Sequence, residues 1–345
     1  MKGRVVALDQ IDGREAAALI VDGTLVDFLI DPPGDDALTP GAICRGIVDR
    51  PMKGQGGVFV KLPGGSGFLK QVSGLAPGQR VVVQVSGVAE PGKAVPVSLR
   101  VLFKSRHCIV TPGAPGINIS RRIREEDRRA VLEALAADAM AGAGEGFGLI
   151  LRSVAEHADD EDIAADIAEM RALAEAVMAD TAGGPELLVA AAGAHELAWR
   201  EWADPAPDAV EEDGFAPLGV HEMLDDLLDA DVALPGGGGM VIEPTRALVA
   251  VDVNTGPDTS PAAALKVNVA AARDLPRQLR LRGLGGQVVV DFAPMSKKDR
   301  AVLDQVLRGV FRAEGAETSL AGWTTLGLYE LQRKRDRQPL REALA

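Results

Sequence analysis

Two aspartates lie where buried strands are expected to end, and they carry the clearest chemical signal in the sequence. Asp252 follows the apolar run ALVAV, and Asp291 follows the apolar run QVVV. In α/β sheets, sites form just beyond the carboxyl ends of strands, so two neighbouring strands would bring these carboxylates together. Asn254, two residues after Asp252, points to the same side of an extended chain. Because hard cations prefer oxygen ligands, this pattern indicates a site for Mg²⁺ or Mn²⁺.

Such a site suits the hydrolysis of a phosphodiester. Attack by water builds negative charge on the phosphorus oxygens, and a metal ion both neutralises that charge and acidifies a bound water. The competing interpretation is that each aspartate only caps a strand end or a turn, and the residues alone leave both interpretations open. Two glycine-rich segments, residues 63–67 and 234–240, lack the lysine and hydroxyl pattern of a phosphate loop and are expected to be turns.

The chain of 345 residues has a formal net charge of -13, but its charges are unevenly distributed. Residues 201–231 hold eleven acidic side chains and no lysine or arginine. The basic residues gather in three groups: Arg121, Arg122, Arg124, Arg128 and Arg129; Arg277, Arg280 and Arg282; and Arg333, Lys334, Arg335, Arg337 and Arg341. One such group alone is best explained as a solvated helix face. Three groups in an otherwise acidic chain favour a polyanionic partner.

Composition and targeting signals point to the cytoplasm. The N-terminal segment MKGRVVALDQ lacks the apolar core of a signal peptide, and no apolar stretch is long enough to span a bilayer. We therefore expect a cytoplasmic protein without a membrane span. The two cysteines, Cys44 and Cys108, are far apart and form no C-x-x-C pair, which argues against a structural zinc site or a disulfide framework.

The last third of the chain is predicted to be α/β, and its elements would position the two aspartates. The expected elements are a strand hairpin over residues 240–254 that turns near Glu243 and Pro244, a helix over 261–282 that Pro276 kinks or interrupts, a strand over 286–292, a helix over 296–314 capped by Ser296, and a strand with a turn over 324–331. Strands that alternate with helices imply a sheet with crossover connections.

The first third is predicted to be β-rich. Asp22 and Gly23 mark a hairpin turn, and the brief strands of residues 42–104 suggest a small closed barrel. On such a barrel Phe59 and Phe68 could stack on bases, although the sequence alone slightly favours packing in the core for each of them. The middle of the chain is predicted to hold a helix that begins after Ser120, helices over 159–181 and 184–203, and a loop over 204–219.

Several stretches resemble the catalytic half of the RNase E/G family of bacterial endoribonucleases. They are DGTLVDFLID, GINISRRI, GFGLILRS, GGGGMVIEPTRALVAVDVNTG and NVAAARDLPRQLRLRGLGGQVVVDF, which follow the family's order. The resemblance implies a multidomain α/β (α+β) fold in three parts. These parts are an RNase H-like part over residues 1–35 and 184–233, an OB-fold RNA-binding barrel over 36–183 with a 5′-sensor inserted at about 105–183, and a DNase I-like catalytic part over 234–345.

The same resemblance implies roles for particular residues. Asp252 and Asp291 would hold Mg²⁺, and Asn254 would support them as a third catalytic residue. The 5′-monophosphate pocket would comprise Ile119, Arg152 and Ser153, where the family usually has threonine at the last of these positions. The remaining RNA contacts would come from Phe59, Phe68, Lys93, Arg333 and Arg335.

Some features depart from the family's pattern. Members of the family commonly continue into a zinc-binding cysteine motif that joins subunits, and this sequence has no such motif. We therefore expect no zinc, and a possible homodimer would form without the zinc link. Pro294 stands where a second acid often follows Asp291, Ala270 replaces a usual glutamate, and Pro276 lies within a predicted helix. These changes spare the predicted metal pair but could lower activity.

The predicted function is Mg²⁺-dependent endonucleolytic cleavage of single-stranded RNA, in RNA processing or decay, with 5′-phosphate products. The alternative is a catalytically weakened member of the same family that binds RNA without cutting it. A third interpretation is a scaffold whose acidic segment 201–231 recruits basic partners.

Overall fold

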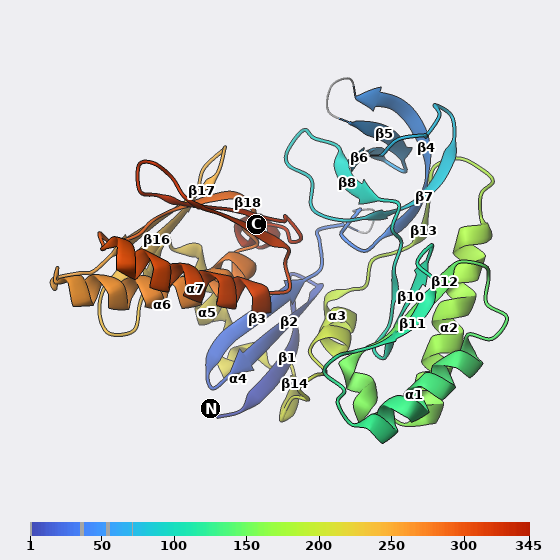
Figure 1. Cartoon of the computed structure of the whole chain (residues 1–345), viewed down its shortest axis with the longest axis horizontal. Helices are drawn as coiled ribbons and strands as arrows, with labels where there is room; N and C mark the ends of the chain where they lie inside the picture. Colours follow the sequence, from blue (N-terminus) through green and yellow to red (C-terminus); the bar gives the residue numbers. More distant parts are fainter. Residues whose placement is uncertain (1, 35–37, 53–55, 71) are drawn as a thin grey trace. The chain divides into compact units, whose positions relative to one another are not determined.

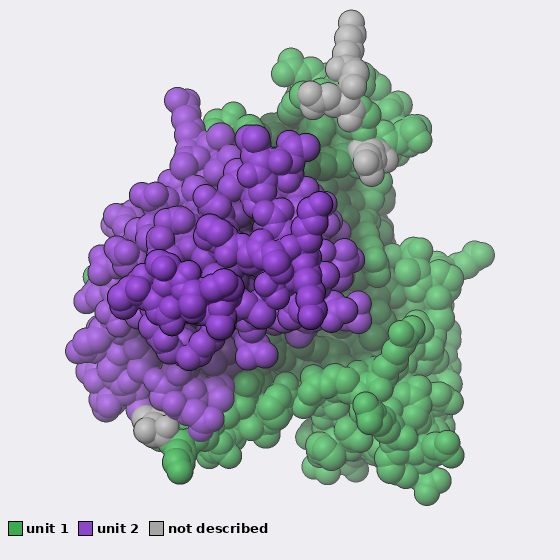
Figure 2. Space-filling view, turned by 60° about the vertical axis from the view of Figure 1, so that its left-hand side comes forward, with its two compact units in different colours: residues 1–17, 29–212 green, residues 18–28, 213–345 purple. Residues whose placement is uncertain are grey.

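The computed structural model describes residues 2–34, 38–52, 56–70 and 72–345 (Figure 1). Its backbone contacts divide the chain into two compact units, which Figure 2 colours separately. Unit 1 comprises Met1–Ala17 and Leu29–Glu212, and unit 2 comprises Ala18–Phe28 and Asp213–Ala345. No helix within the described ranges is both long enough and apolar enough to cross a membrane.

The N-terminal strands form a four-stranded sheet in the order β14-β1-β2-β3. The strands are β1 (Arg4–Ile11), β2 (Arg14–Val21), β3 (Thr24–Ile30) and β14 (Ala209–Glu212). Asp22 and Gly23 both have positive φ, as a two-residue hairpin turn requires, so the predicted hairpin is confirmed. The loop predicted over 204–219 is partly wrong, because β14 pairs in parallel with β1 and the short helix α4 (Phe215–Leu218) follows.

The second sheet closes into a five-stranded barrel, as expected for an OB-like fold. Its strands are β4 (Ile43–Met52), β5 (Gly57–Leu62), β6 (Gly65–Lys70), β7 (Arg80–Val85) and β8 (Val95–Ser98). The order β4-β5-β6-β8-β7 is closed by pairing of β7 with β4. Apolar residues that alternate along these strands, such as Val58, Val60 and Val83, fill the interior.

The helix predicted over residues 184–203 is wrong in its first half. Residues Glu186–Val189 form strand β13, which pairs antiparallel with β4, and only Ala194–Glu201 is helical, as α3. The local sequence ELLV is compatible with a helix, but the hydrogen bonds offered by β4 decide the outcome.

A third sheet is inserted in the chain between β8 and β13. It has the order β11-β12-β10-β9, and its elements are β9 (Phe103–Lys104), β10 (Cys108–Pro112), β11 (Gly116–Ile119), α1 (Glu126–Ala139), β12 (Phe147–Leu151), the 3₁₀ helix η1 (Ser153–Glu156) and α2 (Asp160–Ala179). The predicted N-cap Ser120 is wrong. Its hydroxyl accepts from the backbone of Arg122 in a turn, and Glu125 caps α1 instead.

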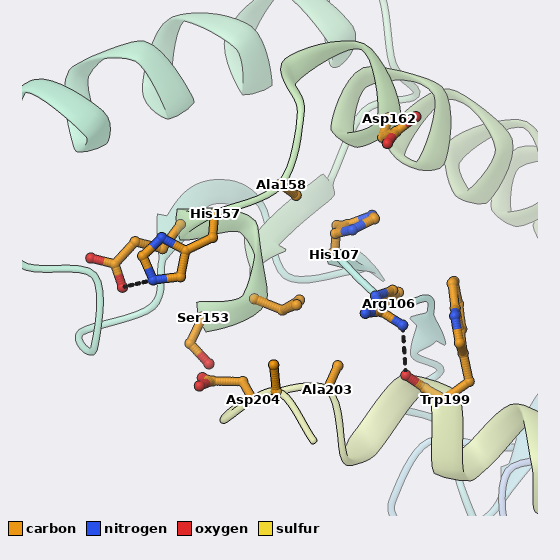
Figure 3. Close-up of a pocket in the computed structure, with 12 residues that line it drawn as sticks. Arg106, His107, Ser153, His157, Ala158, Asp162, Trp199, Ala203 and Asp204 are labelled. Atoms are coloured by element: carbon orange, nitrogen blue, oxygen red, sulfur yellow. Dashed lines mark hydrogen bonds and ion pairs between the residues drawn. The ribbon is translucent and has the colours of Figure 1, made fainter. Parts of the chain in front are cut away.

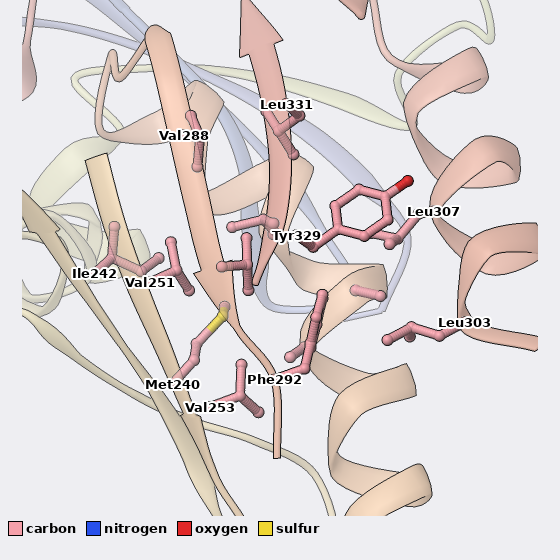
Figure 4. Close-up of a cluster of buried hydrophobic side chains, with 14 of the residues drawn as sticks. Met240, Ile242, Val251, Val253, Val288, Phe292, Leu303, Leu307, Tyr329 and Leu331 are labelled. Atoms are coloured by element: carbon pink, nitrogen blue, oxygen red, sulfur yellow. The ribbon is translucent and has the colours of Figure 1, made fainter. Parts of the chain in front are cut away.

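The fourth sheet belongs to unit 2 and has the order β15-β16-β17-β18-β20-β19. Its elements are α5 (Val220–Leu228), β15 (Asp231–Ala233), β16 (Gly239–Pro244), β17 (Val249–Asn254), α6 (Pro261–Leu281), β18 (Gly286–Asp291), α7 (Lys297–Ala313), β19 (Thr318–Trp323), β20 (Tyr329–Arg333) and α8 (Leu340–Ala343). Figure 4 shows Val251 and Val288 of the strands and Leu303 and Leu307 of α7 in one core, with Phe292 and Tyr329 between them.

Details of this sheet correct the sequence-based predictions. Pro276 is buried within α6 and does not interrupt it, whereas Ser296 caps α7 as predicted. The turn after β16 lies at residues 245–248, because Thr245 bonds Leu248 through both its backbone and its hydroxyl. The strand predicted within residues 324–331 corresponds to β20. The prediction missed β19, which precedes β20 in the sequence and pairs with it.

The chain thus has a mixed α/β fold with a closed five-stranded barrel and, over the described residues, eight α-helices. The RNase H-like and DNase I-like parts and the domain boundaries stay predictions.

Candidate active site and anion-binding pocket

Asp252 and Asp291 lie directly opposite each other on neighbouring parallel strands. The register of β17 and β18 pairs Val249 with Val288 and continues to the pair Asp252 and Asp291. Neighbouring strands are about 4.8 Å apart, so two carboxylates at matched positions can reach one cation. Both side chains are exposed, and the alternation along each strand turns them away from the apolar core.

The sequence folds this way because valines alternate with polar residues at the ends of both strands. Val251 and Val253 are buried against α6, which makes the crossover between β17 and β18. Gly238 has a positive φ, and a Cβ there would lie 2.4 Å from the carbonyl oxygen of Asn254. The glycine-rich segment before β16 is therefore a turn that lets the chain approach the end of β17 closely, as predicted for residues 234–240.

Two asparagines fix the surroundings of the carboxylates. The amide of Asn254 donates to Oδ2 of Asp252 at 2.7 Å. Asn268 of α6 is fully buried, donates to the carbonyl of Ala293 at 2.8 Å and accepts from its backbone N–H at 3.0 Å. Asn268 thus clamps the chain two residues beyond Asp291 and determines how it leaves the sheet.

The donor set fits a hard divalent cation. Two carboxylates on one sheet face supply the oxygen ligands that Mg²⁺ prefers while leaving positions for water. Within the described ranges, no three His, Cys, Asp or Glu side chains gather as a metal cluster. Cys44 and Cys108 are both buried, in the barrel core and in the core of the inserted sheet respectively.

The candidate RNA-stacking residues pair with each other on the barrel. Phe59 and Phe68 are register partners on β5 and β6, with ring centroids 5.2 Å apart. Both are half-buried and alternate with the inward-facing residues of their strands, so they lie on the outer side of the barrel wall. The guanidinium of Arg50 lies 5.4 Å from the Phe59 centroid. Lys93 is exposed, and its ammonium is 2.7 Å from the carboxylate of Glu90.

The basic group near the C-terminus is largely engaged inside unit 2. Arg333 is only 2% exposed and pairs with Glu314, which also pairs with Arg280. Arg335 is half-buried, and its guanidinium covers the backbone of Gly286. These contacts are structural, and the RNA-contact roles of Arg333 and Arg335 stay predictions.

The predicted 5′-phosphate residues come together at the ends of two strands in unit 1. Ile119 is buried and pairs in register with Leu151, so β11 and β12 end side by side. Arg152 follows β12, and its guanidinium donates to the carbonyl of Ser105 at 2.8 Å. Its other terminal nitrogen lies 2.5 Å from the carboxylate of Glu201. Ser153 begins η1 and lines a pocket of about 400 Å³ (Figure 3).

One carboxylate organises the loop that supports Arg152. Oδ2 of Asp166, on α2, accepts from the Ser105 hydroxyl at 2.7 Å and from the His107 backbone at 2.9 Å, and it lies 3.1 Å from Nδ1 of His107. The carbonyls of Ser105 and His107 in turn accept from Arg152. Asp166 is thus a positioning residue for that guanidinium.

Comparison with known proteins decides the family. The family model described as the Ribonuclease E/G family matches residues 103–214 and 207–336, which contain Arg152, Asp252 and Asp291. The chain belongs to the ribonuclease E/G family. This confirms the resemblance drawn from the sequence.

Individual relatives of this ribonuclease E/G family member cover most of its length. Ribonuclease E of Nostoc sp. (strain PCC 7120 / SAG 25.82 / UTEX 2576) is 30% identical, over 88% of this chain and 52% of that protein. Ribonuclease E of Synechocystis sp. is 30% identical over 78% of this chain and 45% of that protein. Ribonuclease G of Salmonella typhimurium is 29% identical over 77% of this chain and 62% of that protein. The chain therefore spans about half to three fifths of the length of these relatives.

Sequence reasoning missed three residues of this family member's candidate sites. They are Asn268, Asp166 and Glu201, each of which acts through a contact with a residue at least 25 positions away. Asn268 carried a weak signal, as a polar residue on the apolar face of an amphipathic helix. Nothing in the sequence near Asp166 or Glu201 sets them apart from the other acids of α2 and α3.

Proposed function

We propose that this chain is an endoribonuclease that hydrolyses single-stranded RNA with Mg²⁺, or Mn²⁺, held by Asp252 and Asp291. The observation that carries the proposal is the register that sets these two aspartates opposite each other on parallel strands. The names of the relatives, ribonuclease E and ribonuclease G, support the same class of activity. The products would carry a 5′-phosphate and a 3′-hydroxyl.

Each residue of the candidate active site has a defined task in this proposal. Asp252 and Asp291 supply ligand oxygens from one face of the sheet. Asn254 donates to Asp252 and so holds that carboxylate in one orientation. When bound, the cation would acidify a water and offset the charge that builds on the phosphate. The clamp from Asn268 to Ala293 fixes the exit of the strand that carries Asp291.

The substrate would be held at sites away from the reacting phosphate. Phe59 and Phe68 present adjacent rings on the barrel, and base stacking on such rings is worth about 1–3 kcal/mol per base. Lys93, whose ammonium lies 2.7 Å from the Glu90 carboxylate, would exchange this partner for an RNA phosphate. Arg152 and Ser153, with a backbone contact at Ile119, would favour a 5′-monophosphorylated end. A cytoplasmic location and a homodimer without a zinc link stay predictions.

The test is cleavage of a 5′-monophosphorylated RNA oligomer with Mg²⁺ by the wild type, Asp252→Asn and Asp291→Asn. We expect cleavage by the wild type and a loss of at least about a hundredfold in both variants. The matched control is Glu243→Gln, which removes one acid from the neighbouring strand β16 and should leave cleavage unchanged. Undiminished cleavage by both aspartate variants would sink the metal assignment.

The alternative function is RNA binding without cleavage. The observation that favours it is the small ligand set: among the residues that the structure describes, no third acidic, histidine or cysteine side chain joins Asp252 and Asp291, and Pro294 is exposed beyond Asp291. Binding of the oligomer by the wild type without any cleavage would support this alternative.

A further inference from the structure

The pocket beside Ser153 has the size of a small-molecule site. One side of the pocket is formed by η1 and the segment that leads into α2 (Figure 3). The other side is formed by the end of α3 and the residues that follow it. All of its lining residues belong to unit 1. Its volume of about 400 Å³ falls within the range of pockets that enclose small organic ligands. The pocket therefore has room for one nucleoside.

One wall of the pocket is formed by an indole ring with a guanidinium stacked on it. Trp199 of α3 is 57% exposed, the most exposed tryptophan or phenylalanine among the described residues, so its ring contributes little to the core. The guanidinium of Arg106 lies 4.5 Å from the Trp199 centroid and donates to the Trp199 carbonyl at 3.1 Å. Indole rings and guanidinium planes are the platforms on which proteins stack unpaired bases. The guanidinium that lies over the indole ring therefore gives the pocket a flat surface for a base, and Trp199 supports that guanidinium from behind.

The charges of the other lining residues decide which part of a nucleotide fits inside. Glu156, Asp162 and Asp204 all line the pocket, and Asp204 is held by Arg122 at 3.1 Å. These carboxylates repel a phosphate, but they can accept hydrogen bonds from the amino groups of bases. A phosphate is better placed at Arg152, next to Ser153 at the pocket wall.

We propose that this pocket binds the 5′-terminal nucleobase of the RNA, stacked on Trp199 and Arg106, while Arg152 and Ser153 hold the attached 5′ phosphate. The proposal rests on the proposed function and deepens it. The end of the RNA is recognised by its base as well as by its phosphate, and a 5′ phosphate without a base binds more weakly.

The test measures binding alone, without divalent cations, so that cleavage plays no part. The probes are a 5′-phosphorylated single-stranded RNA decamer and the same decamer with an abasic first nucleotide, followed by fluorescence anisotropy with the full chain. For the wild type we expect the abasic probe to bind about tenfold more weakly. In Trp199→Leu the two probes should bind within about twofold of each other.

Further variants separate stacking from general charge and from misfolding. Trp199→Phe keeps a ring and should restore most of the difference between the probes. Arg106→Gln should reduce the difference, whereas Arg124→Gln, which removes an exposed arginine that does not line the pocket, should preserve it. Because Trp199 is exposed, Trp199→Leu should unfold at the same temperature as the wild type.

The outcomes distinguish this inference from the proposed function. Equal binding of both probes by the wild type would overturn the base pocket while leaving RNA binding intact. The base pocket would also be overturned if a folded Trp199→Leu variant still bound the abasic probe about tenfold more weakly than the intact probe. Failure of the wild type to bind either probe would overturn both proposals.

Discussion

The guanidinium of Arg152 is paired with the carboxylate of Glu201, with 2.5 Å between Nη2 and Oε2. Burial acts to raise the pKa of Glu201, but attraction by Arg152, Arg200 and Lys104 outweighs it and lowers that pKa. The carboxylate therefore stays charged at neutral pH. A 5′ phosphate that uses Arg152 has to compete with this resident anion.

Glu201→Gln should strengthen the preference for a 5′-monophosphorylated end. Glutamine has the shape of the glutamate side chain but no negative charge. The guanidinium of Arg152 then has no resident anion and is available to a 5′ phosphate. We expect the ratio of affinities for 5′-phosphorylated over 5′-hydroxyl RNA to rise up to about fivefold, measured by anisotropy without divalent cations. The control is Glu196→Gln on the same helix, whose carboxylate lies 3.9 Å from Arg200. A fall in the ratio would mean that Glu201 positions Arg152 instead of competing for it.

Asp291→Asn should stabilise the metal-free protein while abolishing cleavage. Like charges directly opposite each other on neighbouring strands are destabilising, and Asp252 and Asp291 are such a pair. Removing one charge should raise the free energy of unfolding by about 0.2–1 kcal/mol in urea with a chelator present. Mg²⁺ should raise the unfolding temperature of the wild type and have little effect on the variant. A destabilised variant would show that the two carboxylates do not repel each other.

The juxtaposition of these aspartates could be predicted because it depends on local patterns. Each follows a short, valine-containing apolar run that is typical of a buried strand, and the intervening amphipathic helix α6 makes the crossover between two parallel strands. The role of Ser296 as the N-cap of α7 could be predicted in the same way, since a serine directly before a charged first helical turn is a local signal.

Long-range pairing could not be predicted in the same way. Residues 186–189 become a strand only because they pair with residues 43–45 of β4, which is far away in sequence, and β14 forms against β1 in the same way. Asp166 acts through its contact with the loop around Ser105, and Glu201 acts through its contact with Arg152. No sequence pattern predicts either contact. Nor does the group of basic residues reveal that Arg333 is buried against Glu314.

The two thiols should make stability fall at high pH. Burial raises the pKa of Cys44 to about 11, and burial is also the main cause that raises the pKa of Cys108 to about 12, from an ordinary value of 9.0. A raised folded-state pKa gives stability that is complete below the unfolded pKa and is lost as the pH rises through the folded pKa. The free energy of unfolding in urea should therefore fall between pH 9 and 11, and Cys108→Ala should show a shallower fall. Equal slopes for the two proteins would contradict the assignment.

Asn268→Ala should be strongly destabilising and should also impair cleavage. The substitution leaves the buried N–H and carbonyl of Ala293 without the partners that lie 3.0 and 2.8 Å away. We expect a loss of about 3 kcal/mol in the free energy of unfolding, measured in urea. Asn118→Ala, at an exposed position of β11, is the control and should change stability by less than about 0.5 kcal/mol. Since the clamp fixes the chain just beyond Asp291, kcat should fall more than KM changes. A variant that is destabilised but keeps its full kcat would limit Asn268 to a purely structural role.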